Sequence, residues 1–504
     1  MFYKNDDTID QNDENSFYTL TESIDKIKFI NTPNEVQLID VDPDLFDNLF
    51  KSLNIGYYEK QNINFIEIFS RLSQIYSEGH TNSFQFAQKY HFYSICYDII
   101  VKCPDIEFLK NLLICIYFGI RSDLNLLDVF SNSTFCEQLI YCMDEKGSSI
   151  YSIGFNILSN LIKGYSHNLF DKIIYMYNTT PFTSTNDFGV EILNSYGLVF
   201  SKISNYIDEL NYPYMLIMAK SLLLYGAFNY STDILTNLND RFRSAHTNIF
   251  LSIQLTEDQF SNLSDTNQYY FLNYKSTEEV NISQLEQPIF SYLLSSIPQI
   301  KSQSDIFHFD FCSTLIKTLS LINKLADHSW YYRSCFKPLR SNIQVVQYLY
   351  ELMNYDENAD IQSQACLLVA NICLTEEYEL VMQQSIMETF IRRISNSSMK
   401  VRKSCLKGII NATSKFTEEQ IDDLVKWGVL EEMLDFYLGD FYDTQADIAI
   451  SFWLLFQRSK LARNKGLEYY NQFEEIRLET QDDNLSARFY LILLELNKEK
   501  YSWS

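Results

Sequence analysis

The sequence predicts an all-α protein made of stacked helical units. Its 504 residues include only 13 Gly and 8 Pro, so residues that interrupt helices are scarce. No Asn-Gly or Asp-Gly turn joins two alternating apolar runs, as it would in a β-hairpin. An apolar pattern recurs about every 40 residues, a period typical of helical repeats that bury their apolar faces against one another. We therefore expect an α-solenoid with no sheet of note.

The repeat is clearest in residues 360–457. Its first copy comprises Ile361, Ala365, Cys366, Val369, Ala370 and Asn371. In the second copy, 40 residues later, the matching residues are Val401, Cys405, Leu406, Ile409, Ile410 and Asn411. A fainter third copy holds Thr444, Ile448, Phe452 and Leu454. An earlier copy, 211 residues before the first, holds Ile150, Gly154, Phe155, Leu158, Ser159 and Asn160. Its small residue Gly154 predicts a close approach between neighbouring helices.

The composition along the chain predicts two helical halves. Residues 1–16 are polar and acidic, and we expect them to be disordered. Helical repeats are expected over 17–228 and again over 288–504. Between them, residues 229–287 are loosely patterned and acidic, which predicts an irregular linker or insertion with short helices. Within the first half, Phe84–Val101 is expected to be one helix.

The net negative charge of the chain limits the kinds of partner that it can bind. The chain has 65 Asp and Glu against 40 Lys and Arg, a formal net charge of −25. This field would repel a nucleic-acid backbone or an anionic membrane surface, so we expect neither to bind. The longest uncharged apolar run, Leu112–Ile120, is shorter than the roughly 20 residues that cross a bilayer. The excess acid is interpreted first as a solubilising surface and second as a sign of a basic partner.

Cysteine usage and the start of the chain predict the compartment. The ten Cys include no CxxC pair and no zinc-finger spacing with a His. The first residues are acidic, which a secretory signal peptide is not. We expect free thiols and a cytoplasmic location, with a nuclear one left open.

Motifs that carry catalysis or hold cofactors are missing from the sequence. It contains no GxG, GxSxG or HExxH, and no two of its six His are four residues apart. Asp40, Asp42 and Asp44 resemble the start of a calcium loop, but Leu45 and Lys51 occupy the positions that need Gly and Glu. We expect no catalytic residue, cofactor or metal, although a triad assembled from distant residues is left open.

Residues 417–457 carry a family pattern. Thr417 and Gln420 form a capping box, the start of a first helix. A turn follows at Gly428, then a second helix, and a longer third helix is expected over 443–457. This unit resembles an armadillo repeat, and the unit before it resembles one less closely. The resemblance implies a right-handed superhelix whose third helices line a concave groove.

The resemblance also implies a candidate partner groove. In peptide-binding armadillo proteins, Asn side chains of the third helices bond the backbone of an extended peptide, and Asn160, Asn371 and Asn411 occupy that position here. Lys407 lies one turn before Asn411, where nuclear-import receptors carry a Trp. Because an amide offers both donors and an acceptor, each Asn could instead bond a neighbouring helix. Both interpretations remain open from the sequence.

A basic edge interrupts the acidity of the second half. It comprises Arg392, Arg393, Lys400, Arg402 and Lys403. Such a cluster is either a solvated face or a site for an acidic partner.

These observations favour a protein-protein interaction scaffold or adaptor that is monomeric and presents its groove to a protein partner. The alternative is a regulatory or assembly subunit of an enzyme complex, and the third hypothesis is an unrecognised enzyme. A scaffold predicts a continuous surface with clustered polar and aromatic side chains. An enzyme predicts one deep pocket in which titratable groups converge.

Overall fold

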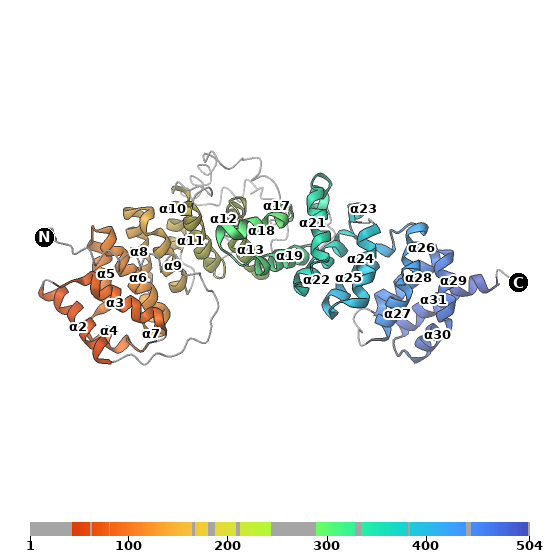
Figure 1. Cartoon of the computed structure of the whole chain (residues 1–504), viewed down its shortest axis with the longest axis horizontal. Helices are drawn as coiled ribbons and strands as arrows, with labels where there is room; N and C mark the ends of the chain where they lie inside the picture. The colour runs from red at the N-terminus through yellow and green to blue at the C-terminus, as the bar shows by residue number, and fades with distance from the viewer. Residues whose placement is uncertain are drawn as a thin grey trace. The chain divides into compact units, whose positions relative to one another are not determined.

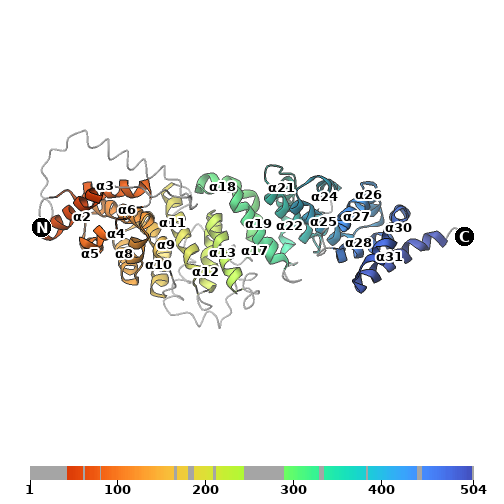
Figure 2. The ribbon, with the colours of Figure 1, turned by 90° about the horizontal axis from the view of Figure 1, so that it is seen from below.

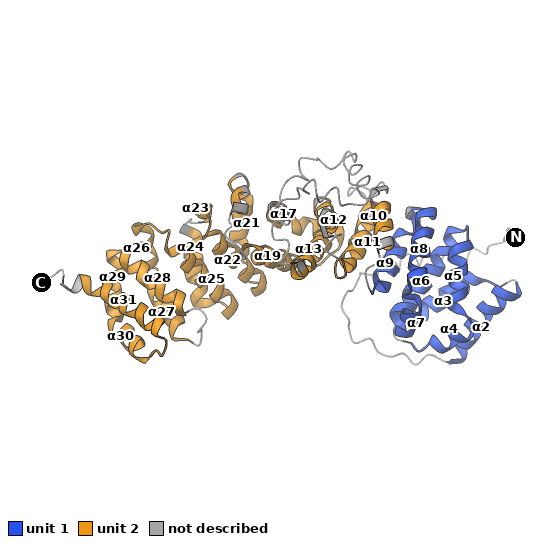
Figure 3. Cartoon of the chain, turned by 180° about the vertical axis from the view of Figure 1, so that it is seen from behind, with its two compact units in different colours: residues 1–163 blue, residues 164–504 orange. Residues whose placement is uncertain are grey.

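The computed structural model describes residues 43–60, 63–79, 81–163, 167–179, 187–207, 212–242, 289–327, 334–381, 384–439 and 445–501. All regular elements in these ranges are helices and none is a strand, which confirms the all-α prediction. The chain divides into two compact units, unit 1 (Met1–Lys163) and unit 2 (Gly164–Ser504), which Figure 3 colours separately. Segment 1–16 lies outside the described residues.

Unit 1 is a succession of short amphipathic helices. They are α2 (Pro43–Glu59), α3 (Phe65–Glu78), α4 (Phe84–Lys89), α5 (Phe92–Lys102), α6 (Ile106–Ser122), α7 (Leu124–Phe130), α8 (Ser133–Lys146), the 3-10 helix η1 (Ser148–Ile150) and α9 (Tyr151–Leu161). In α3 the buried residues Phe69, Leu72 and Tyr76 follow the helical period, and Asn64 caps its first turn by accepting from the backbone N–H of Glu67. Helix α3 packs on α6, and α6 packs on α9 (Figure 1).

Unit 2 continues with helices of the same kind. They are α10 (His167–Thr179), α11 (Asp187–Ile203), α12 (Tyr212–Leu224), α13 (Phe228–Phe242), α17 (Ile289–Ser296), η3 (Ile297–Gln299), α18 (Ile300–Phe307), α19 (Phe311–Asp327), η4 (Ser334–Ser341), α21 (Ile343–Met353), α22 (Ala359–Ile372), α23 (Tyr378–Val381), α24 (Gln384–Asn396), α25 (Met399–Thr413), α26 (Glu418–Lys426), α27 (Val429–Leu438), α28 (Gln445–Arg458), α29 (Lys460–Gly466), η5 (Leu467–Tyr469), α30 (Tyr470–Glu479) and α31 (Asp483–Tyr501). One row packs in the order α11, α13, α19, α22, α25, α28 and α31, as Figure 2 shows from below.

Polar contacts repeat with the same period as the apolar pattern. The hydroxyl of Tyr57 donates to Asp98, 41 residues further on, at 2.8 Å. Lys400 pairs with Asp360 at a separation of 40 residues. Other pairs between 36 and 44 residues apart are Asn54–Tyr90, Asn132–Tyr93, Tyr177–Ser221 and Arg488–Ala446. The period therefore extends over parts of both units where the apolar pattern alone does not reveal it.

The capping box and the glycine turn predicted within 417–457 are both present. The Thr417 hydroxyl accepts from the backbone N–H of Gln420 at 3.3 Å, and the Gln420 amide accepts from that of Thr417 at 2.9 Å. Gly428 has φ of 90° between α26 and α27, a left-handed conformation that favours glycine. The predicted close approach at Gly154 is also present, because a Cβ there would lie 2.1 Å from the Met143 sulfur.

Three expectations are corrected. The expected helix Phe84–Val101 breaks into α4 and α5 at His91, whose φ of 56° no α-helix accommodates. Residues 229–287 are not a linker from their start, because α13 packs on α11, α12 and α19, and only 243–288 lies outside the described residues. The division between the compact units falls at Lys163 rather than in that segment.

A buried carboxylate in unit 1, that of Asp123, is only 2% exposed and accepts several hydrogen bonds. Its Oδ2 accepts from the backbone N–H groups of Ser83 and Phe84, both at 2.9 Å. Its Oδ1 accepts from the backbone N–H of Asn125 at 3.0 Å, which caps α7. One side chain thus caps a helix and holds the start of α4 one repeat earlier.

We expect Asp123→Ala to lower the free energy of unfolding by at least about 2 kcal/mol, because it strands buried N–H groups at roughly 1–3 kcal/mol each. The matched control is Asp128→Ala, which removes a side chain that is 70% exposed and paired with Lys163. That change should cost about 1 kcal/mol or less. Urea denaturation followed by circular dichroism measures both, and equal losses would contradict the role of Asp123.

Candidate functional site

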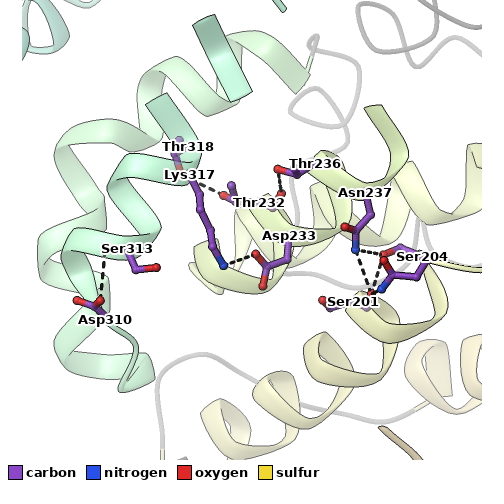
Figure 4. A network of polar contacts seen from close by, with 11 residues as sticks. Ser201, Ser204, Thr232, Asp233, Thr236, Asn237, Asp310, Ser313, Lys317 and Thr318 are labelled. Carbon is purple, nitrogen blue, oxygen red and sulfur yellow. Dashed lines mark hydrogen bonds and ion pairs between the residues drawn. The ribbon is translucent and has the colours of Figure 1, made fainter. Parts of the chain in front are cut away.

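A cleft of about 450 Å³ lies in unit 2 between α11, α13 and α19. Apolar atoms form the larger part of its surface, but most of the residues that line it carry a polar group: Ser201, Asp233, Thr236, Asn237, Ile316, Lys317, Ser320, Leu321 and Lys324. Figure 4 shows Lys317 of α19 facing Asp233 of α13, and Asn237 of α13 facing Ser201 and Ser204 at the end of α11.

Ion pairs cross the cleft from α19 to α13. The Lys317 ammonium lies 2.7 Å from an oxygen of Asp233, and the Lys324 ammonium lies 3.5 Å from an oxygen of Asp240. The side chains of the two lysines are 50% and 47% exposed. Exposed ion pairs of this kind are worth at most about 1 kcal/mol, so a charged ligand could exchange with either member at low cost.

Hydrogen bonds join the three helices that surround the cleft. The hydroxyls of Thr232 and Thr318 lie 3.0 Å apart, both buried, and join α13 to α19. The Asn237 amide donates to the Ser204 hydroxyl at 2.9 Å and to the Ser201 carbonyl at 3.4 Å, which joins α13 to α11. The three helices are thereby held in register around the opening (Figure 4).

The lining can bind polar groups but does not assemble a catalytic constellation. It contains hydroxyls, an amide, a carboxylate and ammonium groups, and none of its lining residues is His or Cys. Sequence reasoning missed this site, since Asp233, Thr236 and Asn237 fall in the segment interpreted as a linker. The helical spacing of Ile234, Leu235 and Leu238, all fully buried, is the signal that could have revealed α13.

Asn371, expected in the partner groove, is placed elsewhere. Its side chain is 4% exposed, and its amide donates to Oδ1 of Asn323 in α19 at 3.0 Å. The Asn323 amide in turn donates to the carbonyl oxygen of Gln364 in α22 at 2.9 Å. A side chain buried in this way favours the second of the two interpretations that the sequence left open, in which the Asn bonds a neighbouring helix: Asn371 ties α22 to α19.

The other groove candidates have different environments. Asn411 is half-buried, and its amide donates to the carbonyl of Ala370 near the C-terminal end of α22 at 2.9 Å. It therefore satisfies a carbonyl in the last turn of the preceding repeat. Asn160 is exposed and donates to the Asn156 carbonyl of its own helix at 2.7 Å. Lys407 is half-buried on α25.

The first part of the basic edge makes contacts between repeats. Arg393 in α24 is paired with Asp356, and its guanidinium holds the pKa of that carboxyl below its usual range. The Arg392 guanidinium donates to the side-chain oxygen of Asn354. Both partners lie between α21 and α22, one repeat earlier.

The second part of the basic edge is on α25. Lys400 is paired with Asp360 of α22. The Arg402 guanidinium lies 5.2 Å from the ring centre of Phe436 in α27, a cation–π contact. Lys403 is half-buried. Much of the charge of this edge thus holds adjacent helices together, which favours the solvated-face interpretation; an acidic-partner site here remains a prediction.

The nine Cys that the structure describes fully are free thiols, and most of them are buried. Burial raises the pKa of Cys136 and Cys373 to about 12 and that of Cys142 to about 11. Thiols with such pKa values are poor nucleophiles and poor metal ligands at neutral pH. Within the described ranges no three His, Cys, Asp or Glu side chains are grouped to hold a metal ion. No helix in those ranges is long and apolar enough to cross a membrane.

Comparisons with known proteins bear on the fold. An engineered protein solved crystallographically by the Northeast Structural Genomics Consortium is similar, with a TM-score of 0.58, 12% identity, and coverage of 90% of this chain and 98% of that one. A second engineered protein from the same consortium covers 56% of this chain at a TM-score of 0.39 and 11% identity, too low to support an argument. No family model and no curated protein matches the sequence. At such low identity the first likeness supports an all-α fold of repeated helices and nothing about activity.

Single Asn→Ala substitutions test the placement of the repeat asparagines. Asn371→Ala removes the donor to the buried Asn323 Oδ1, so the free energy of unfolding should fall by roughly 1–3 kcal/mol. Asn411→Ala should lower it by a smaller amount, because this residue is half-buried. Asn160→Ala is the matched control from the same repeat position, and its effect should stay within about 0.5 kcal/mol. Thermal melts of the three variants measure these effects. A melting temperature of Asn371→Ala equal to that of the wild type would refute a stabilising role for the Asn371–Asn323 hydrogen bond.

Proposed function

We propose that the protein is a binding scaffold, an armadillo-like helical solenoid that holds an extended segment of a partner protein in the cleft between α11, α13 and α19. The observation that supports this most directly is the cleft itself. Three helices of the packed row place side chains that donate and accept hydrogen bonds around one opening. An extended peptide offers N–H and C=O groups along its length, which such a lining can bond.

The size and charge of the cleft support this proposal. A volume of about 450 Å³ accommodates a few side chains and lies within the usual range of roughly 300–1,000 Å³ for ligand sites. Lys317 and Asp233 present opposite charges on facing helices, so a partner segment that carries both signs is matched best.

The chemistry of the described residues favours binding over catalysis. The lining of the cleft lacks a nucleophile with an adjacent base, and buried thiols such as Cys373 have raised pKa values. These features support a scaffold rather than an enzyme, and free thiols are compatible with the cytoplasmic location expected from the sequence.

A pair of Ser→Arg variants on α19 tests the proposal. Ser320 lines the cleft, so Ser320→Arg should fill it and displace a bound segment. Ser313 is exposed on the same helix and does not line the cleft, so Ser313→Arg is the matched control. We expect affinity purification from the source cell, quantified by mass spectrometry, to recover one partner set with the wild type and the control. Ser320→Arg should no longer recover these partner proteins, although its melting temperature should equal that of the wild type. Recovery of the same partner proteins with all three proteins would refute the cleft as their binding site.

A further inference from the structure

Helix α31 carries an apolar stripe on its outer side. Tyr490 is 51% exposed, Leu491 46% and Leu494 45%, values unusual for large apolar side chains that lie close together. At about 100° per residue these positions share one face of the helix with an exposed Ala and with a charge at either end. We call this set the α31 stripe: Asp483, Ala487, Tyr490, Leu491, Leu494 and Lys498.

The opposite side of α31 is the one that packs inside unit 2. Leu485, Phe489, Ile492, Leu493 and Leu496 are buried there against α28 and α30. An amphipathic helix with one packed face normally presents polar residues on the other. Because α31 is apolar on both sides, its outer face has the character of a surface that packs against a further helix.

The stripe is self-complementary about a two-fold axis. If two copies of α31 pack antiparallel with the axis between Tyr490 and Leu491, each Tyr490 faces the other copy's Leu491. The same operation places Ala487 opposite Leu494, a small residue against a large one. It also places Asp483 opposite Lys498. A two-fold interface requires this kind of self-matching, in which residue i contacts j and j contacts i.

The charges at the ends of the stripe support the same arrangement. The Asp483 carboxylate makes no hydrogen bond or ion pair with any other described residue, and Lys498, with a side chain 66% exposed, bonds only Glu495 among them. The Lys498 ammonium has three N–H donors, so it can retain Glu495 and still reach a second carboxylate. An antiparallel pair gains two Asp483–Lys498 contacts, whereas a parallel pair would bring like charges together.

We propose that the α31 stripe is a homodimer interface in which two copies of the protein pack antiparallel through this helix. This differs from the monomer expected from the sequence, and it is independent of the cleft. One helix face buries less than the roughly 800 Å² per partner of a standard interface, so we expect a dissociation constant in the micromolar range.

Sedimentation equilibrium of the full chain over a range of concentrations tests the interface. The wild type should fit a reversible monomer–dimer equilibrium. Leu494→Asp places a carboxylate in the apolar part of the stripe, opposite Ala487 of the other copy, and should raise the dissociation constant at least tenfold. Leu124→Asp is the matched control, because Leu124 is 68% exposed and lies in unit 1. Its dissociation constant should equal that of the wild type.

Charge reversal tests the antiparallel register itself. Asp483→Lys alone places Lys opposite Lys, and Lys498→Asp alone places Asp opposite Asp, so each variant should dimerise severalfold more weakly than the wild type. When the two variants are mixed, both end contacts become Lys–Asp pairs, and a heterodimer should form with near wild-type affinity. Thermal melts check that Lys498→Asp, which also removes the partner of Glu495, remains folded; if it does not, Asp483→Lys and Leu494→Asp decide alone.

Two outcomes would overturn the proposal. A wild type that stays monomeric well above micromolar concentration excludes the interface. A dimer that Leu494→Asp and Asp483→Lys leave unchanged shows that copies associate through a different surface.

Discussion

None of the helices that the structure describes can bury its apolar side alone, and the fold depends on that constraint. Each helix of the row α19, α22, α25 and α28 is covered by the next helix of the row and by the shorter helices between them. Residues such as Val369, Cys405 and Phe452 are fully buried because the adjacent repeat covers them. Stability in such an array comes mainly from contacts between neighbouring repeats. The interval between equivalent positions must therefore stay regular, so that the apolar faces of adjacent repeats meet.

Polar contacts between repeats add register to this apolar packing. Apolar contacts alone would allow one helix to shift along its neighbour. A buried hydrogen bond, in contrast, is lost when the helix moves by one residue. Asp123 fixes the start of α4 from the next repeat, and Asn371 fixes α22 against α19. Both side chains are almost fully buried, so a shift would leave polar groups without partners. These contacts give the polar residues at such buried positions a structural role, although apolar residues there would bury more apolar surface.

The period was predictable from the sequence because similar residues recur at a fixed interval. The local signals, such as the residues that begin a helix, were predictable because each signal lies within a few residues of the chain. The capping box at Thr417 and the small residue at Gly154 are such signals, and both form as expected. The environment of Asn371 was not predictable, since its partner Asn323 lies 48 residues away outside the recognised repeats. The break at His91 was missed because the apolar spacing continues across it, and a single left-handed residue leaves no mark in that pattern.

The cleft lies where the regular interval fails. Lys317 and Asp233 are 84 residues apart in the chain, and Thr318 and Thr232 are 86 apart, about twice the separation of equivalent contacts elsewhere. Helices α13 and α19 nevertheless pack directly, with α17 and α18 between them in sequence. Besides their buried apolar residues, these two helices meet through Lys, Asp and Thr side chains. Polar side chains are therefore present around the opening, and the proposed binding of a partner segment relies on their hydrogen-bonding groups.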